Sequence, residues 1–355
     1  METSRNRIRL LTIIISSGLL VFSLFSWYIF LHTDFISEIS GKNISEISKI
    51  IEDEFSDHIY KKSSLAKKDA LMTYLLTGEI SSSQVKEGDD GWLFYLSESD
   101  GNPLGIYEGS FRLSDDELEA IRTSVSQTAD YLEEKNIELG LLVIPDKETI
   151  YSEYVPKKYQ KADATSTEQI DEVLKSLDIN YAYLKEMLLA NKNADYPLYY
   201  KTDTHWNKIG GYLGAKAALE MFDIKLPELS ELTIDKVERD AGDLANMANI
   251  GQFLDYELDY FIKEMPVISQ QISDDLVELH NPSAHSSKTV LIVGDSFRKG
   301  LLAGMLYEFE NVHVIHRDYY ETEMLDDINP DYLFAIYVER YAPKMNGLAE
   351  TIIGN

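Results

Sequence analysis

The C-terminal third of the chain alternates short apolar runs with helical patterns. Residues 289–293 and 332–338 are largely apolar runs, residues 312–316 predict a further strand, and residues 297–309 and 321–328 between them have helical spacing. Apolar strands that alternate with helices are typical of a parallel sheet covered by helices on both faces. We therefore predict an α/β fold with a parallel central sheet.

The same rhythm begins earlier in the chain. Residues 139–144 predict a further buried strand. Ser114 followed by Glu117 forms a capping-box pattern that opens a helix over residues 114–135. The remaining predicted elements are strands at 92–96, 180–184 and 196–200, helices at 167–177 and 207–222, and a mixed, irregular stretch over 230–287.

An uncharged apolar run lies near the N-terminus. As a helix, Leu10–Leu31 would span about 33 Å, enough for a bilayer core of about 30 Å. Arg5, Arg7 and Arg9 precede the run, which predicts a cytoplasmic N-terminus and an exported remainder. A cleaved signal peptide is the alternative, but the run is longer than its usual apolar core and no A-x-A-like site follows.

These patterns predict four segments. Residues 1–9 form a cytoplasmic tail, 10–32 a transmembrane signal anchor, 33–85 a helical stalk or docking region, and 86–355 an extracytoplasmic domain. Apolar residues at helical spacing over 36–78 support the stalk, and a partner-binding helix is the alternative. The expected location is the cell membrane, crossed once, with contact to the lipid bilayer through the N-terminal helix.

Composition removes several classes of function. Lys plus Arg total 33 against 61 Asp plus Glu, a net charge of −28, so nucleic-acid binding is excluded for lack of a basic footprint. The absence of cysteine excludes disulfides, thiol catalysis and Cys-ligated metals. No Gly-rich phosphate-binding motif and no H-E-x-x-H is present. We therefore predict neither a metal site nor a bound cofactor.

A serine stands where a strand gives way to a helix. Ser296 follows Gly294 and Asp295 at the end of the strand predicted over 289–293. Ligands of open α/β sheets bind at the carboxyl ends of the strands, and the N–H groups of a helix N-terminus favour a developing oxyanion. Ser296 is therefore a candidate nucleophile, and an ordinary helix N-cap is the alternative.

A carboxylate and an imidazole lie close together in the segment 201–207. Asp203 and His205 are two positions apart, so an extended backbone would put both side chains on one face. A serine nucleophile needs such a base and an orienting carboxylate. The alternative is that Asp203 caps the helix predicted over 207–222 or its lead-in turn and that His205 is a packing residue.

Five segments in a fixed order resemble a known family. They are GWLFY at 91–95, IPDK at 144–147 with IYSEYVP at 150–156, DTHWN at 203–207, AGDLANM at 241–247 and LIVGDSF at 291–297. Together they resemble the SGNH-hydrolase-like domain of the alginate O-acetyltransferase family (AlgJ and AlgX type), over roughly residues 50–342. The resemblance implies a three-layer α/β/α sandwich and makes residues 86–355 its catalytic domain.

The resemblance also implies chemistry and partners. Ser296 would be the nucleophile, His205 the base and Asp203 its orienter, with the Asp-His pair preceding the serine, a permuted order for SGNH hydrolases. The acceptor would be a hydroxyl of an exopolysaccharide or cell-wall glycan. The acetyl group would come from a polytopic membrane-bound O-acyltransferase (MBOAT-type) partner.

Other residues are secondary candidates. The candidates for binding substrate are Arg317, Trp206, Tyr337 and Arg340. The alternatives are a surface salt bridge for Arg317, a wedge under the Asp-His turn for Trp206, and structural roles for Tyr337 and Arg340. Lys147 is expected to pair with a buried acid. The oxyanion-hole candidates are Ser296, Gly242, Asn246 and Asn249.

Three functions fit these residues. The first is a membrane-anchored O-acetyltransferase that works through an acetyl-serine. The second is an O-acetylesterase with the same triad, in which water replaces the sugar. The third is a non-catalytic assembly factor of a polysaccharide export complex, against which the presence of all three triad residues argues.

Overall fold

The computed structural model describes residues 17–18, 20–24, 62–192 and 196–354, in two units, Met1–Thr77 and Gly78–Asn355. In the first unit α4 spans Lys62–Thr77. The predicted cytoplasmic tail, most of the predicted anchor at 10–32 and residues 33–61 of the predicted stalk lie outside the described residues. Of the helices in the described part, none has the length and hydropathy needed to cross a bilayer.

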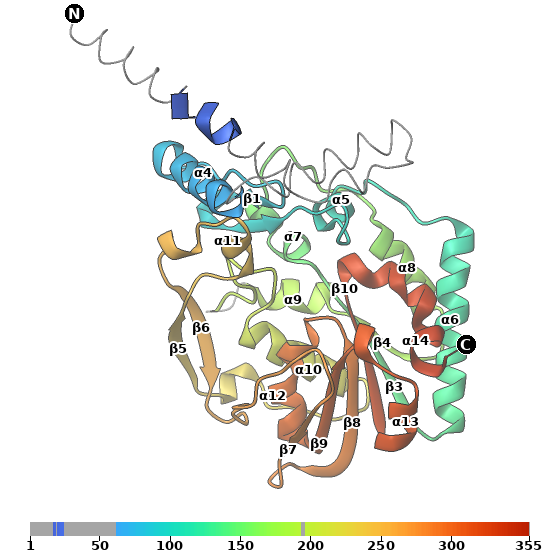
Figure 1. Ribbon diagram of the computed structural model, residues 1–355. Helices are drawn as coiled ribbons and strands as arrows, with labels where there is room; N and C mark the ends of the chain where they lie inside the picture. Colours follow the sequence, from blue (N-terminus) through green and yellow to red (C-terminus); the bar gives the residue numbers. More distant parts are fainter. Residues whose placement is uncertain (1–16, 19, 25–61, 193–195, 355) are drawn as a thin grey trace, which may run out of the picture. The chain divides into compact units, whose positions relative to one another are not determined.

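The second unit is built on a six-stranded sheet (Figure 1). Its strand order is β4-β3-β10-β8-β9-β7. The strands are β3 (Glu138–Ile144), β4 (Asn180–Tyr183), β7 (Val277–His280), β8 (Ser286–Gly294), β9 (Phe309–His316) and β10 (Tyr332–Val338).

The sheet is mixed, which corrects the prediction of a parallel sheet. The five strands from β4 to β9 run parallel, whereas the edge strand β7 pairs antiparallel with β9, Val277 opposite Val314. Only residues 281–285 separate β7 from β8. So short a connection cannot make the crossover that a parallel strand needs, and β7 must run antiparallel to β8 and therefore to its neighbour β9.

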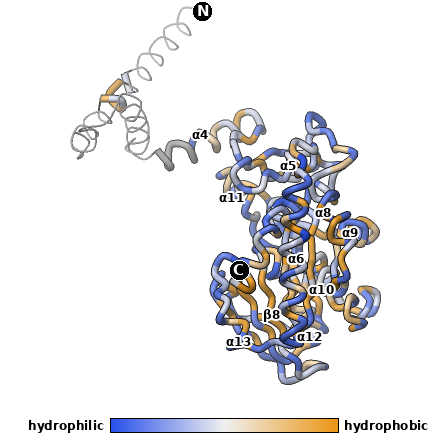
Figure 2. The backbone as a smooth tube through the Cα atoms, turned by 90° about the vertical axis from the view of Figure 1, so that its right-hand side faces the viewer, coloured by the Kyte–Doolittle hydropathy of each residue, from blue (hydrophilic) through white to orange (hydrophobic). Residues whose placement is uncertain are grey.

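Two apolar cores, one on each face of the sheet, make the three layers. Along β10, Phe334 and Ile336 point into one core, while Leu333 and Ala335 point into the other. This alternation follows from the two-residue period of a strand. Because both of its faces are buried, β10 is a continuous apolar run in sequence. Figure 2 shows apolar segments, β8 among them, through the middle of the fold.

Helices cover both faces. The first core includes side chains of α10 (Lys208–Glu220), α12 (Arg298–Glu308) and α9 (Lys185–Asn191). The second includes side chains of α6 (Asp115–Glu134), α8 (Ser166–Lys175), α13 (Glu323–Ile328) and α14 (Leu348–Ile353). The predicted capping box of Ser114 and Glu117 opens α6. The three-layer α/β/α arrangement is therefore as predicted.

Smaller elements lie outside the sandwich. They are the hairpin β1 (Val85–Glu87) and β2 (Leu93–Tyr95), the hairpin β5 (Ile234–Arg239) and β6 (Glu257–Ile262), and the short helices α5 (Pro103–Tyr107), α7 (Lys147–Ile150) and α11 (Asp243–Met247). The stretch 230–287, predicted to be irregular, contains the second hairpin, α11 and β7. The predicted strand at 196–200 is wrong, because only an isolated bridge joins Tyr199 to Trp206.

Parallel strands bring distant residues to one edge. Gly294 of β8 lies level with His316 of β9 and with Ile336 of β10. The residues that follow these strands, among them Ser296, Arg317 and Arg340, therefore meet at the carboxyl edge of the sheet, where ligands of such folds bind.

Candidate active site

The turn that carries Ser296 is fixed by the carboxylate before it. Asp295 Oδ1 accepts the Phe297 N–H at 3.0 Å, and its Oδ2 accepts the Val338 N–H at 2.7 Å. The side chain of Asp295 is buried and ties the end of β8 to the end of β10. Within the described residues the backbone N–H of Ser296 has no acceptor.

Asp203 and His205 lie in a turn and not in the extended backbone we predicted. Asp203 Oδ1 accepts a hydrogen bond from the backbone N–H of His205 at 3.1 Å. This contact forms an Asx turn, in which the short carboxylate side chain reaches the backbone two residues ahead. The same oxygen lies 2.7 Å from His205 Nδ1. The turn therefore brings carboxylate and imidazole together without a strand.

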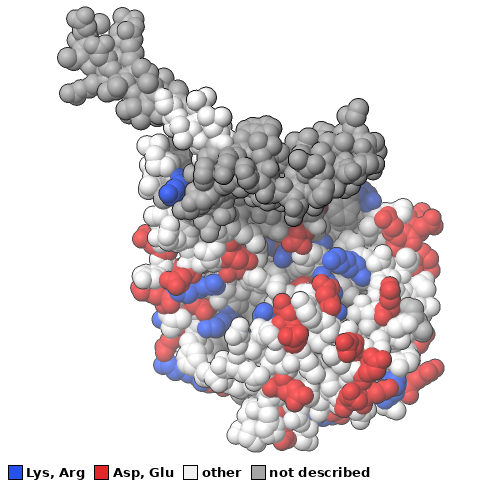
Figure 3. All heavy atoms as spheres, viewed as in Figure 1, with Lys and Arg blue, Asp and Glu red and all other residues white. Residues whose placement is uncertain are grey.

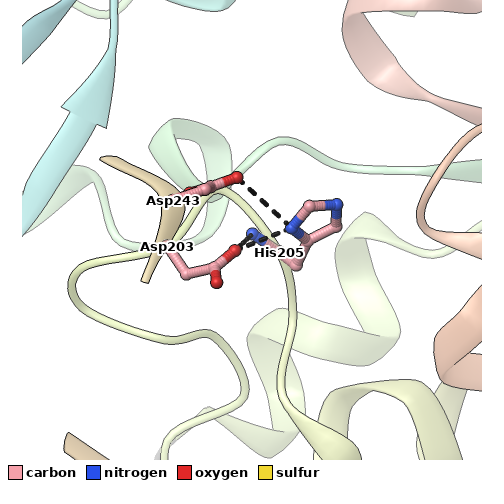
Figure 4. Close-up of side chains that lie close together, drawn as sticks. All are labelled: Asp203, His205 and Asp243. Atoms are coloured by element: carbon pink, nitrogen blue, oxygen red, sulfur yellow. Dashed lines mark hydrogen bonds and ion pairs between the residues drawn. The ribbon is translucent and has the colours of Figure 1, made fainter. Parts of the chain in front are cut away.

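The structure brings the three candidate catalytic residues together. His205 Nε2 lies 2.7 Å from Ser296 Oγ, and Nδ1 lies 2.7 Å from Asp203 Oδ1. Figure 4 shows the imidazole turning Nδ1 toward the carboxylates, with its other nitrogen directed away from them. With Nδ1 protonated, Nε2 can accept the serine proton, which is the arrangement of a nucleophile, a base and an orienting acid.

The Asp203 carboxyl is held in its ionised form. Burial by itself would raise its pKa, but the hydrogen bonds from His205 and the positive charge of Arg239 outweigh burial and hold the pKa of Asp203 well below its usual range. Arg239 Nη2 donates to Asp203 Oδ2 at 2.9 Å. A permanent negative charge thus stands beside the imidazole and favours its protonated form during a reaction.

Two polar neighbours of the triad were not predicted. Asp243 accepts the Thr204 N–H at 2.7 Å and the Thr204 hydroxyl at 2.6 Å, and its Oδ2 lies 3.6 Å from His205 Nδ1. Asp243 belongs to the segment AGDLANM, so the family resemblance contained a signal for it. Arg239 had none, because its strand lies in the stretch predicted to be irregular.

Asp203, His205 and Asp243 could also be considered as metal ligands. Their donor atoms lie within 4.8 Å of one another. However, the guanidinium of Arg239 and the hydroxyl of Thr204 already donate to these carboxylates. A cation at this position would compete with the positive charge of Arg239, so the donor set fits a hydrogen-bonded relay better than a metal.

Lys147 tethers the turn from beneath. Its buried ammonium group donates to the carbonyl oxygens of Tyr200, Lys201 and Asp203 at 3.2, 3.1 and 2.7 Å. The predicted pairing with a buried acid is therefore wrong, because three backbone carbonyls take all three of its N–H bonds. Burial lowers the pKa of Lys147 to about 8.

The oxyanion-hole candidates differ in whether their N–H groups are free to bind a substrate oxygen. The N–H of Gly242 donates to Thr202 Oγ1 at 2.8 Å, so it is already engaged. A Cβ at Gly242 would overlap Asp203, and glycine here allows the close approach of the two backbones. Asn246 is exposed and its Nδ2 faces Ala241 O, while Asn249 Nδ2 faces Met247 O. The unengaged N–H of Ser296 is the donor that the geometry favours.

Trp206 has the wedge position. Only 3% of the residue is exposed, and its indole N–H donates to Phe297 O at 3.2 Å. A Cβ at Gly300 or at Gly214 would overlap the indole. The ring therefore fills the space between α10 and α12 and is not a platform for stacking a sugar.

The other three substrate-binding candidates are buried behind the nucleophile turn. Arg340 forms an ion pair with Asp146. Arg317 Nη1 lies 3.7 Å from Asp295 Oδ2, and its guanidinium lies over the rings of Tyr337 and Tyr341. Tyr337 itself is 3% exposed. In these positions the three side chains are placed to support the Asp295 turn.

A cavity opens at the triad. It has a volume of about 310 Å³ and is lined by Asp203, His205, Trp206 and Ser296 together with Tyr200, Asn207, Lys208, Lys299 and Gly300. A second, apolar cavity of about 200 Å³ shares Lys208, Lys299 and Gly300 with it. On the face shown in Figure 3, basic side chains lie among many acidic ones.

Solved structures share this fold. A DHHW family protein from Eubacterium siraeum is 18% identical, with a TM-score of 0.55 over 78% of this chain and 97% of that one. PatB1 of Bacillus cereus is 17% identical, with a TM-score of 0.53 over 73% and 96%. PatB1 with a sulfonyl adduct is 18% identical, with a TM-score of 0.52 over 72% and 96%. A comparison with curated proteins gave no significant match.

The sequence itself matches a family over most of the second unit. Residues 85–311 match the family described as the SGNH hydrolase-like domain of acetyltransferase AlgX. This range contains Asp203, His205 and Ser296 and more than half of the chain. The chain therefore belongs to the AlgX family of SGNH hydrolase-like, acetyltransferase-type proteins.

Proposed function

We propose that this protein is a membrane-anchored, extracytoplasmic O-acetyltransferase that acetylates hydroxyls of an exopolysaccharide or cell-wall glycan. The observation that carries the proposal is the continuous chain of short contacts from Ser296 through His205 to Asp203. Membership of an acetyltransferase family supports acetyl as the transferred group.

In the first half-reaction Ser296 Oγ attacks the carbonyl carbon of an acetyl donor. The Oγ proton passes to His205 Nε2, and Asp203 stabilises the imidazolium. The Ser296 N–H, which lies two residues before α12, stabilises the negative charge on the carbonyl oxygen. The bond to the leaving group then breaks, the leaving group takes the proton from Nε2, and an acetyl-serine remains.

In the second half-reaction a glycan hydroxyl gives its proton to His205 Nε2 and attacks the acetyl-serine. The tetrahedral intermediate collapses, Ser296 Oγ recovers the proton, and the acetylated glycan leaves. The cavity of about 310 Å³ is within the range for small-ligand sites, and the adjoining apolar cavity extends it along α12.

The source of the acetyl group follows from the expected location of the domain outside the cytoplasm. Acetyl-CoA is made in the cytoplasm, whereas the charge pattern around residues 10–32 predicts an exported domain. The net charge of −28 would also repel a polyanionic cofactor. We therefore propose that an MBOAT-type partner hands acetyl across the bilayer and that the chain itself binds no cofactor.

The competing enzyme is an O-acetylesterase. The side chain of His205 is 30% exposed, so water can reach the base as well as a sugar can. The two activities differ in whether the acetyl-serine is resolved by water or by a held acceptor. Product analysis with an oligosaccharide acceptor distinguishes acetylated sugar from free acetate.

The test uses the full-length protein with 4-nitrophenyl acetate. The wild type should release nitrophenolate in a burst and become acetylated at Ser296. Ser296→Ala should do neither, whereas Ser287→Ala, an exposed serine of β8, should behave as the wild type. Because a sulfonyl adduct of PatB1 exists, a sulfonyl fluoride should also label Ser296 and prevent the burst.

The cellular test measures acetyl content of purified extracellular and wall polysaccharides. Deletion should abolish acetylation of one polymer, and wild-type protein but not Ser296→Ala should restore it. Restoration by Ser296→Ala would overturn catalysis at this site and favour the assembly-factor function.

A further inference from the structure

The β5–β6 hairpin lies outside the sandwich but contacts the Asp-His turn at several points. From β6, Glu257 accepts the N–H of Lys201 and, at 2.9 Å, the hydroxyl of Thr202. Asp259, also on β6, accepts the Tyr200 hydroxyl at 2.6 Å. The hairpin therefore binds the residues that lead into Asp203.

Arg239, the last residue of β5, touches the triad itself. Its Nη2 donates to Asp203 Oδ2 at 2.9 Å, and its guanidinium carbon lies 3.9 Å from the centre of the Tyr200 ring. The Tyr200 ring thus supports one face of the guanidinium, and Asp259 holds the Tyr200 hydroxyl. This stacking fixes a cation that otherwise has many rotamers.

The two oxygens of Asp203 have separate partners. Oδ1 accepts from the backbone and the ring of His205, while Oδ2 accepts from Arg239. Among the described residues Oδ2 has no other hydrogen-bond donor. Without Arg239 the carboxylate would be held through Oδ1 alone, so it could rotate and move the imidazole out of line with Ser296.

An ordinary surface salt bridge does not account for this pair. Exposed ion pairs contribute little because water screens them. The Asp203 side chain, however, is only 10% exposed, and its partner is the group that orients the base. A charge-assisted hydrogen bond at such a site is stronger than a neutral one and has a defined direction.

We propose that Arg239 is a positioning residue for the proposed acetyl transfer, fixing Asp203 so that His205 stays aligned on Ser296, and that the β5–β6 hairpin is part of the catalytic machinery. This inference rests on the proposed function. The other charged groups around the Asp203–His205 pair are Asp243 from α11, Lys147 from α7 and Glu257 from β6.

The experiment compares Arg239→Gln and Arg239→Lys with the wild type in 4-nitrophenyl acetate turnover, at equal concentrations of sites titrated by a sulfonyl fluoride. We expect Arg239→Gln to lose about ten- to hundredfold in kcat/KM, mostly in kcat. Its acidic pH limb should move to higher pH, because the site loses the positive charge that lies beside Asp203 and then takes up a proton more readily. Arg239→Lys, which keeps the charge, should keep the limb and recover part of the rate.

The matched control is Lys263→Gln, which removes an exposed cation from the same hairpin, paired with Asp235. It should change neither rate nor pH profile. A wild-type kcat/KM in Arg239→Gln would overturn the positioning role. A lower kcat/KM in Arg239→Gln would also overturn it if the pH profile stayed unchanged and Arg239→Lys did not restore the rate. Failure of the proposed function looks different, because Ser296→Ala would then retain turnover.

Discussion

The turn that carries Ser296 and the turn that carries His205 meet at one site, but they are held in different ways. Ser296 follows a central strand, and the Asp295 carboxylate fixes its turn through two backbone N–H groups. The Asp203–His205 turn lies outside the sheet and is held by side chains, Lys147 beneath it and Arg239 beside it. The first turn is therefore anchored to two strands of the central sheet, and the second depends on side chains that come from outside that sheet.

This difference predicts an all-or-none effect on activity for substitution of Ser296, and graded effects for substitutions around the Asp203–His205 turn. Removing Ser296 should abolish the proposed reaction, whereas each contact of the Asp203–His205 turn should contribute a part.

The largest effect is expected at the nucleophile. Ser296→Ala should lower kcat by about a millionfold and leave the free energy of unfolding nearly unchanged, because a small hydroxyl is lost from a site that opens into a cavity. The measurement is burst kinetics with 4-nitrophenyl acetate beside thermal unfolding. A variant that retains a burst would show that Ser296 is not the group acylated.

The orienting acid should matter less. Asp203→Asn should lower kcat by about ten-thousandfold, since an amide cannot accept from His205 Nδ1 and stabilise the imidazolium in the same way. Steady-state kinetics on the full-length protein measure the loss. An Asp203→Asn effect as large as that of Ser296→Ala would contradict the graded scale.

The tether beneath the turn should act mainly on stability. Lys147→Met keeps the side-chain length but leaves the carbonyls of Tyr200, Lys201 and Asp203 without this donor. We expect the free energy of unfolding to fall by about 2–4 kcal/mol. Chemical denaturation measures the loss. Lys201→Met, an exposed lysine of the same turn, should change it by less than about 0.5 kcal/mol, and equal losses would refute the tether.

The smallest effect concerns pH dependence on the nucleophile side. Burial raises the pKa of Glu339, which follows β10, to about 7. A raised carboxyl pKa stabilises the fold at low pH, and that contribution is lost as pH rises from the unfolded-state pKa toward 7. Glu339→Gln should therefore flatten the stability curve between about pH 5 and pH 8. Glu350→Gln, exposed on α14, is the control, and identical curves for Glu339→Gln and wild type would contradict the prediction.

The same contrast explains what could be predicted from the sequence. Strand β10 and the Ser296 turn have strong local signals, a continuous apolar run and a strand-to-helix junction. The antiparallel edge strand β7 is short and lies in a polar stretch, so its direction depends on the connection to β8 and not on periodicity. The Asp203–His205 pair was found from its spacing and the family resemblance, but its Asx turn depends on a side-chain hydrogen bond that hydrophobic patterns do not encode.

Contacts between distant segments were the least predictable. Lys147 was expected to face an acid, and its three carbonyl partners come from a turn whose shape no local pattern gives. Arg239 had no distinguishing signal, because one arginine at the end of a polar strand is ordinary in sequence. Such residues become meaningful only when the fold places them against a reactive group.

The wedge at Trp206 has a consequence for how the protein matures. Its indole lies against Gly214 and Gly300 and bonds to Phe297 O, so the segment after His205 and the segment after Ser296 share one packed contact. These segments are far apart in the chain, and such contacts form late because loop closure must come first. Competence for chemistry should therefore appear in a late step of folding, and the fluorescence of a variant that keeps Trp206 as its only tryptophan would report that step in real time.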